Sequence, residues 1–152
     1  MAYTNAEARQ QLLDAIAVAI DEIADALASL GVAYEQLDDA HADDLEEQLF
    51  RPVQRAFGRA KRTYASFAER HRLTVREFAT PTVRAPSTGV KGLIENAVAA
   101  VGRAEMELVA LQDSLMPIEV GDAELRAGLS EVRELLGGLS GRARAFVRTF
   151  GR

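Results

Sequence analysis

Histidine and carboxylate side chains at helical spacing are the first residues of this chain that suggest chemistry. Asp38 and His41 stand three positions apart, so one helix face would present both as a pair of metal ligands. The sequence contains 2 histidines, and the second, His71, has Ala68 in the corresponding position. A di-iron bundle needs Glu-x-x-His pairs from two helices. We therefore assign no metal ligand, and a metal-binding four-helix bundle is the third of our three functional interpretations.

Signatures of covalent catalysis and of cofactor binding are missing from the sequence. The number of cysteines is 0, which excludes disulfides, zinc–thiolate sites and iron–sulfur clusters. No local motif brings Ser, His and Asp together, and no Gly-rich loop has the spacing of a phosphate-binding loop. We assign no catalytic residue and no cofactor, and the sequence favours a binding protein over an enzyme.

The clearest pattern is an abrupt change of charge near residue 50. Residues 1–50 carry 12 acidic side chains and 1 basic one, whereas residues 51–84 carry 9 basic and 2 acidic side chains. A charge distribution this uneven produces a field that usually faces a partner. We therefore looked for the face on which the basic residues gather.

Four arginines of the basic segment fall on one side of a helical projection. With Arg51 at the origin and a step of 100° per residue, the other three lie within about 80° of it. The apolar residues Val53, Phe57 and Tyr64 lie on the opposite side. We expect the arginines to point away from the core, where nothing in their own bundle neutralises them. The predicted partner-binding residues are Arg51, Arg55, Arg59, Lys61 and Arg62.

Three kinds of partner suit this basic face: the acidic segment of a second copy, an anionic lipid surface, or a nucleic-acid backbone. The net charge of −5 weakens long-range attraction to a polyanion. No aromatic residues alternate with the arginines, as single-strand binding by base stacking would require. We therefore predict a non-enzymatic interaction or scaffold protein that forms homo-oligomers or binds another protein. Binding of anionic lipid or nucleic acid is the alternative, and a merely solvated charged face is the non-functional interpretation.

The elements that must position this face are predicted from apolar periodicity. In the first helix the apolar spacing alternates between three and four positions. This seam comprises Leu13, Ile16, Ile20, Ile23, Leu27 and Leu30. Thr4 and Glu7 form a capping box in front of it, so we place the first helix at about 5–30.

Gly31 leaves two alternatives for the end of this helix. Followed by Val32, it fits a Schellman ending, which the bounds above adopt. The apolar seam nevertheless continues in phase to Tyr34 and Leu37, as it would in a continuous helix that tolerates the glycine at about 1 kcal/mol. A continuous helix would form one kinked rod with the next helix, and burial of its seam would then need a second copy.

Three further helices follow, at about 34–72, 89–115 and 122–150. Pro52 predicts a kink in the second of them, because proline removes a backbone donor and clashes with the preceding turn. Residues 73–88 lack a helical seam and are predicted to form a crossover that packs some apolar side chains on the bundle. Pro117 is expected to end the third helix, and Gly137 and Gly138 are expected to bend the fourth.

Long amphipathic helices in a chain of 152 residues predict an all-α fold, an elongated antiparallel (up-and-down) bundle in one domain spanning 1–152. The start of the chain does not resemble a signal peptide and no apolar run reaches the ~20 residues of a transmembrane helix, so we expect a cytoplasmic location and no transmembrane segment. The predicted core includes Ile20, Ile23, Leu27, Phe57, Tyr64, Phe67, Val101, Leu108, Val132 and Phe146.

Overall fold

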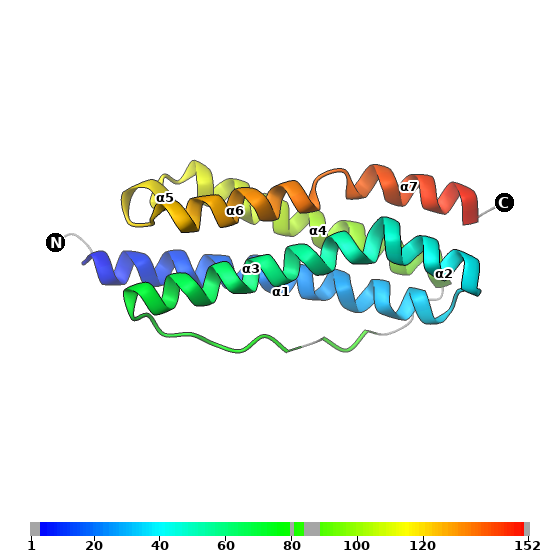
Figure 1. Cartoon of the computed structure of the whole chain (residues 1–152), viewed down its shortest axis with the longest axis horizontal. Coiled ribbons are helices and arrows are strands. Elements are labelled where there is room, and N and C mark those ends of the chain that lie inside the picture. Colours follow the sequence, from blue (N-terminus) through cyan, green and yellow to red (C-terminus); the bar gives the residue numbers. More distant parts are fainter. Residues whose placement is uncertain (1–3, 80, 84–88, 151–152) are drawn as a thin grey trace.

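In the computed structural model, which describes residues 4–79, 81–83 and 89–150, the chain forms an elongated helical bundle (Figure 1). Its helices are α1 (Asn5–Glu35), α2 (Asp39–Leu45), the π-helical turn η1 (Glu46–Phe50), α3 (Arg51–His71), α4 (Gly89–Asp113), α5 (Met116–Glu119), α6 (Ala123–Leu136) and α7 (Leu139–Phe150). No strand occurs in these ranges. The predicted all-α bundle is therefore confirmed.

Helices that contact each other in the bundle run antiparallel. Helix α1 packs on α4 and on α3, and α3 packs in turn on α6. Residues 73–79 and 81–83, which follow α3, run back along the bundle, and α3 and α4 point in the same direction (Figure 1). This segment is the predicted crossover, and its Leu73, Phe78 and Val83 pack against the core.

Helix α1 starts where its capping residue predicts but ends later. The Glu7 N–H donates to Thr4 Oγ1 at 3.1 Å. The helix then passes through Gly31 and ends at Glu35, so the predicted end at residue 30 is wrong. Continuing the helix keeps Ala33 in the core, where it is 0% exposed. The turn comes at 36–38 instead, and it lets α2 and α3 fold back on α1 without a second copy.

Pro52 interrupts the second long helix as predicted, and the structure shows how the interruption is stabilised. The π-helical turn η1 directly precedes α3, which carries Pro52 in its first turn. Because proline has no N–H, the Gln48 carbonyl lacks its usual helical donor. Arg142 of α7 donates to that carbonyl from Nε at 2.9 Å. A side chain distant in sequence therefore satisfies the acceptor that the proline leaves free.

The crossover is attached to the bundle by backbone hydrogen bonds. Arg72 ends α3 in the left-handed region, with φ 55°, and the Leu73 N–H reaches back to the Ala68 carbonyl at 2.9 Å. The Arg76 N–H donates to the Tyr64 hydroxyl at 3.0 Å. Thr74 exchanges two hydrogen bonds with the Gln10 side chain. These contacts hold residues 73–76 of the crossover against α1 and α3.

The second half of the chain departs from prediction at its proline and its glycine pair. Helix α4 ends at Asp113, and Pro117 lies in the first turn of the short helix α5 (Met116–Glu119) rather than ending α4, because proline fits a first helical turn. Gly138, with φ 79°, separates α6 from α7, so the expected bend is a complete break. Asp122 caps α6, because its carboxylate accepts a hydrogen bond from the Leu125 N–H at 2.8 Å.

Eight of the ten predicted core residues are buried, and the other two, Leu27 and Phe57, are half-buried and pack against the core. Phe57 lies at the edge of the buried face of α3, where the Lys61 ammonium sits 4.2 Å from the centre of its ring. The apolar seams therefore identify the core, and only its margins depend on the neighbouring helices.

Candidate functional site

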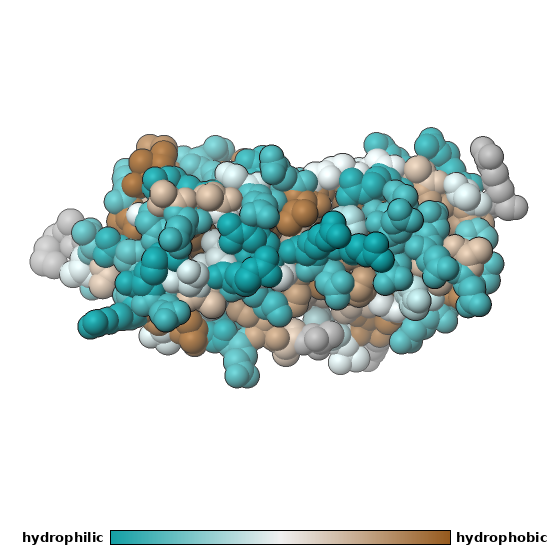
Figure 2. Space-filling model, viewed as in Figure 1, coloured by the Kyte–Doolittle hydropathy of each residue, from teal (hydrophilic) through white to brown (hydrophobic). Residues whose placement is uncertain are grey.

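The basic face predicted from the sequence lies on α3 and is largely exposed to solvent. Arg51, Arg55, Lys61 and Arg62 are all exposed, and hydrophilic side chains cover α3 in the middle of the face shown in Figure 2. No carboxylate in the described part of the chain forms an ion pair with any of these four side chains. The arrangement follows from the opposite face of α3, where Val53, Ala60 and Phe67 fill the core.

Arg59 is the exception, because its own bundle neutralises it. Its Nε donates to Glu131 of α6 at 2.6 Å, and its Nη1 donates to Thr63 at 3.1 Å. Arg59 lies on the edge of the basic face that borders α6, so its charge is used between helices. The prediction that the bundle contains no partner for these arginines is therefore wrong for Arg59.

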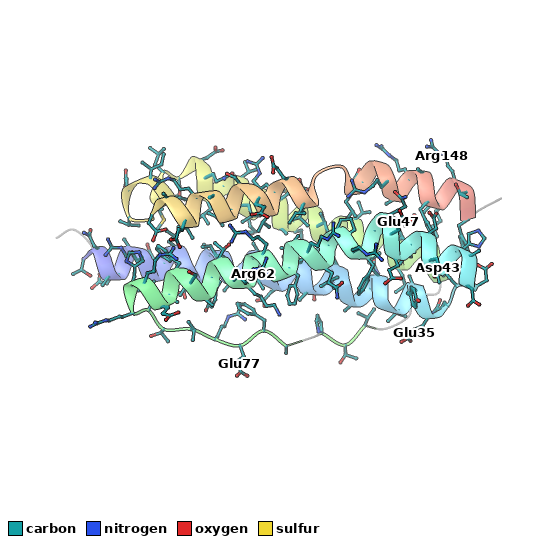
Figure 3. The ribbon with its side chains drawn as sticks, in the orientation of Figure 1. Glu35, Asp43, Glu47, Arg62, Glu77 and Arg148 are labelled. Carbon is teal, nitrogen blue, oxygen red and sulfur yellow. The ribbon has the colours of Figure 1, made fainter. Side chains whose placement is uncertain are left out.

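Seven of the 12 acidic residues of the first fifty, those between Glu35 and Glu47, gather at the opposite end of the bundle from the chain's start. Figure 3 places Glu35, Asp43 and Glu47 around α2 and the end of α1, with Arg62 further along α3. Of these acidic residues, Asp38 contacts His41 Nδ1, and this hydrogen bond lowers the pKa of the Asp38 carboxyl. The surface thus presents an acidic end next to a basic helix face.

The two histidines take part in separate local contacts. His41 lies against Asp38 and packs edge-on to the Phe150 ring at 5.5 Å. His71 Nε2 lies 3.0 Å from Asp122 Oδ2. Within the described residues, no group of three or more His, Asp or Glu side chains is placed to hold a metal ion.

A charged cluster joins the end of α3 to the start of α6. Arg70 donates from Nε and Nη2 to the two carboxylate oxygens of Asp122, both at 2.8 Å, and from Nη1 to Glu124 at 2.7 Å. Partial burial raises the pKa of Asp122, but hydrogen bonds from Arg70, the Leu125 N–H and His71 outweigh this effect and hold the pKa well below its ordinary value. These groups are mutually satisfied, so the cluster fixes two helices together.

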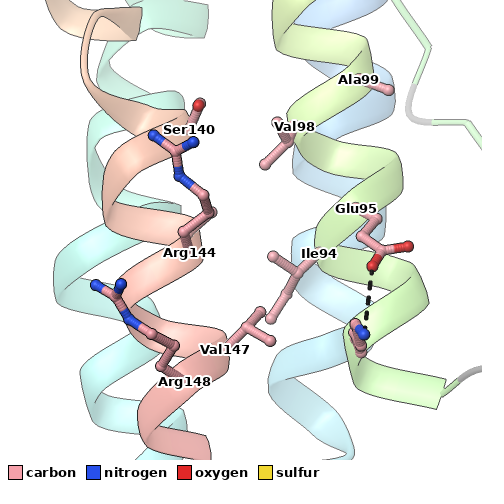
Figure 4. A pocket seen from close by; sticks show the side chains of 10 residues that line it. Ile94, Glu95, Val98, Ala99, Ser140, Arg144, Val147 and Arg148 are labelled. Atoms are coloured by element: carbon pink, nitrogen blue, oxygen red, sulfur yellow. Dashed lines mark ion pairs between the residues drawn. The ribbon is translucent and has the colours of Figure 1, made fainter.

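A groove of about 540 Å³ lies between the first half of α4 and α7. Ile94, Val98 and Val147 point into the space between the two helices (Figure 4). Arg144 and Arg148 lie along its α7 side, and on α4 the Lys91 ammonium lies 4.0 Å from Glu95. The groove therefore combines an apolar floor with a mainly basic rim. Helix α4 packs chiefly on α1 and little on α7, which leaves this side of the bundle open.

Reasoning from the sequence missed the groove, because cations near the end of the last predicted helix are what its dipole favours. The crowding of arginines near the end of α7 is explained by the helix dipole only within the last turn. Arg144 lies six positions before Phe150, where the helix ends, so the dipole does not account for it. The position of Arg144 could be read from the sequence. It indicates a groove only once the helix that neighbours α7 is known.

The chain was compared with protein-family models, with characterised proteins and with solved structures, and no match was found. Among the described residues, no helix has the length and apolar content needed to cross a membrane. The functional argument therefore rests on the surfaces described above.

Proposed function

We propose that the protein is a non-enzymatic interaction protein of the cytoplasm that binds a protein partner, a second copy of itself included, through helix faces. The observation that supports this function is the exposed basic face of α3, where Arg51, Arg55, Lys61 and Arg62 have no acidic partner in the described part of the chain. Arg51 and Arg62 lie about 16 Å apart along the helix axis. A row of solvated guanidinium groups of this length contributes little to folding but suits a complementary acidic surface.

The acidic end of the bundle supports a second copy of the chain as the partner. Its carboxylates on α2 and η1 are mostly exposed, and two copies placed side by side would each offer an acidic end to the basic face of the other. Contacts of this type are reciprocal in a symmetric dimer. They also weaken as salt rises, because exposed charges are screened beyond about 8 Å at physiological ionic strength.

The test is the concentration dependence of the mass in solution, measured by light scattering at low and high salt. We expect association at low salt that decreases with added salt. A variant with Arg51→Gln, Arg55→Gln and Arg62→Gln should lose this association while its melting temperature stays nearly unchanged. Arg59 is left intact because its change would break the contact with Glu131 and confuse folding with binding.

A matched control changes the net charge equally at the other end of the bundle. It carries three substitutions to Gln, at Arg9, Arg72 and Arg126, and its melting temperature is measured as well, because Arg9 and Arg126 donate hydrogen bonds to the Val120 and Pro117 carbonyls. If the control and the α3 variant lose association equally, net charge rather than the basic face is responsible and the proposal fails. Binding of the wild type to vesicles rich in phosphatidylserine or to duplex DNA, lost in the α3 variant only, would instead favour the anionic-surface alternative.

A further inference from the structure

The groove between α4 and α7 has the size and the lining of a site for a small apolar molecule. Its volume is about 540 Å³, and sites for small molecules usually have volumes of about 300–1,000 Å³. Ile94, Val98 and Val147 form its floor (Figure 4). Ala99 and Ala143 add two methyl groups to the lining. Because none of these side chains has a hydrogen-bonding group, the floor favours a hydrocarbon.

The length of the groove indicates how long that hydrocarbon is. The lining extends from Lys91 to Ala99 on α4 and from Ser140 to Arg148 on α7. At about 1.5 Å of rise per residue, each wall is about 12 Å long. An extended alkyl chain with C–C bonds of about 1.52 Å advances by about 1.25 Å per carbon, so a chain of about ten carbons spans the groove.

The rim of the groove carries an excess of positive charge. Arg144 and Arg148 are exposed, and no ion pair within the described ranges includes either side chain. Four positions apart on α7, they are neighbours on one side of the helix. Among the described residues that line the groove, Glu95 is the only carboxylate, and it lies 4.0 Å from the Lys91 ammonium. Three cations against one carboxylate make the rim attractive to an anion.

We propose that the groove binds a fatty acid whose single alkyl chain has about ten carbons. The chain lies on the apolar floor and extends towards Ala99, and the carboxylate lies beside Arg144 and Arg148. In Figure 4, Ala99 lies at one end of the groove and Arg148 at the other. The two guanidinium groups donate charge-assisted hydrogen bonds to the carboxylate oxygens. One ligand therefore uses both the apolar floor and the two arginines that have no acidic partner within the described bundle.

The dimensions of the groove favour a single chain over a peptide helix or a lipid with two chains. Two turns of a helix about 10 Å across occupy roughly 900 Å³, so a helix would leave much of its surface outside a groove of about 540 Å³. A lipid with two chains would leave its second chain in water. The site is separate from the basic face of α3, and the inference does not depend on the proposed function.

The first experiment is isothermal titration calorimetry of the full chain with decanoate, below the critical micelle concentration. We expect saturable binding of one decanoate per chain. Decyltrimethylammonium has a chain of the same length and the opposite charge, and its Kd should be about tenfold higher or more, because it lacks the charge-assisted hydrogen bonds. Decanol has the same chain without a charge and should also bind more weakly than decanoate.

The second experiment tests the two arginines. A variant with Arg144→Gln and Arg148→Gln should raise the Kd for decanoate about tenfold or more, whereas its Kd for decanol should stay nearly unchanged. The matched control carries Arg51→Gln and Arg55→Gln, which remove two exposed arginines at the same spacing from α3. Because α3 does not line the groove, this control should bind decanoate like the wild type.

The third experiment tests the apolar lining without disturbing the core. Ala99 is exposed and lines the groove, so Ala99→Glu places a carboxylate beside the ligand and should raise the Kd for decanoate and for decanol. Ala127→Glu makes the same change at an exposed position of α6 outside the groove and should leave both Kd values unchanged. Circular dichroism checks that each variant remains folded.

Several results would overturn the inference. A wild type that does not bind decanoate refutes it, as does tight decanoate binding by the variant at Arg144 and Arg148. Equal binding of decanoate and decyltrimethylammonium would mean that the groove is merely apolar. If vesicles rich in phosphatidylserine or an acidic amphipathic peptide helix bind through these arginines while decanoate does not, the fatty acid is the wrong occupant. None of these results affects the proposed function, which is tested by self-association and by the α3 variant.

Discussion

Replacing Gly128 with Ala should destabilise the protein, because Thr63 of α3 lies directly against this residue of α6. A methyl group at Gly128 would lie 2.2 Å from Thr63 Oγ1 and 2.7 Å from Thr63 Cγ2. Thr63 is 3% exposed. Its hydroxyl donates to the Arg59 carbonyl at 2.8 Å and accepts from Arg59 Nη1 at 3.1 Å. The side chain therefore cannot rotate away without breaking both hydrogen bonds.

Two opposing effects determine the size of this change. Alanine in a helix interior is more favourable than glycine by about 1 kcal/mol. Inserting the methyl group into a packed contact costs about 1–3 kcal/mol, and displacing the Thr63 hydroxyl costs about 1 kcal/mol more for its buried hydrogen bond. We expect Gly128→Ala to lower the free energy of unfolding by about 1–3 kcal/mol. Gly31→Ala, where nothing lies within 4 Å of the new methyl group, should raise it by about 1 kcal/mol.

Urea unfolding followed by far-ultraviolet circular dichroism measures both variants at one protein concentration. The double variant Thr63→Ala with Gly128→Ala removes the two nearest clashing atoms. It should therefore recover part of the loss, with a coupling free energy of about 1 kcal/mol or more. If Gly128→Ala is stabilised as much as Gly31→Ala, the close contact between α3 and α6 is not present in solution and the reasoning fails.

Three further predictions concern the ends and the core of the bundle. Because the pKa of Asp122 is lowered in the folded state, its contribution to stability is present above the unfolded pKa of about 3.9 and is lost as the pH falls below it. Asp122→Asn should therefore destabilise the protein at pH 7 by about 1–2 kcal/mol, and this difference from the wild type should shrink in acid unfolding experiments below about pH 4. Arg72→Gly should stabilise the protein by about 0.5–1 kcal/mol in urea unfolding, since Arg72 occupies the left-handed region that glycine adopts freely; a lower midpoint would contradict this. Leu108→Ala should lower the free energy of unfolding by about 2–5 kcal/mol, and an unchanged melting temperature would mean that Leu108 is not in the core.

The basic face illustrates how far side-chain direction follows from sequence alone. A helix turns by about 100° per residue whatever surrounds it, so the apolar residues of α3 determine which way its arginines point. Arg51, Arg55 and Arg62 are exposed as expected. Arg59 is paired because α6 places Glu131 beside it. The two residues lie 72 positions apart in the sequence, so their pairing depends on how α6 packs on α3.

The ends of helices were less predictable, because a glycine signals only that a turn is permitted. Gly31 remains inside α1, since continuing the helix buries Ala33 and offsets the cost of the glycine. Gly138 breaks the helix, and the next helix, α7, then supplies Arg142 to the carbonyl that Pro52 leaves free. Only the packing of the whole bundle distinguishes these two glycines.

The sequence by itself determined the fold class, the four long apolar seams, the kink near Pro52 and the direction of the basic face, because each depends on periodicity or on one residue's local chemistry. The tertiary structure alone decided where the hairpin turns, which charges pair between helices and which side of α4 remains uncovered. These features depend on which helices become neighbours and in what register. That choice is made by the summed burial of side chains far apart in the chain, and no local pattern records it.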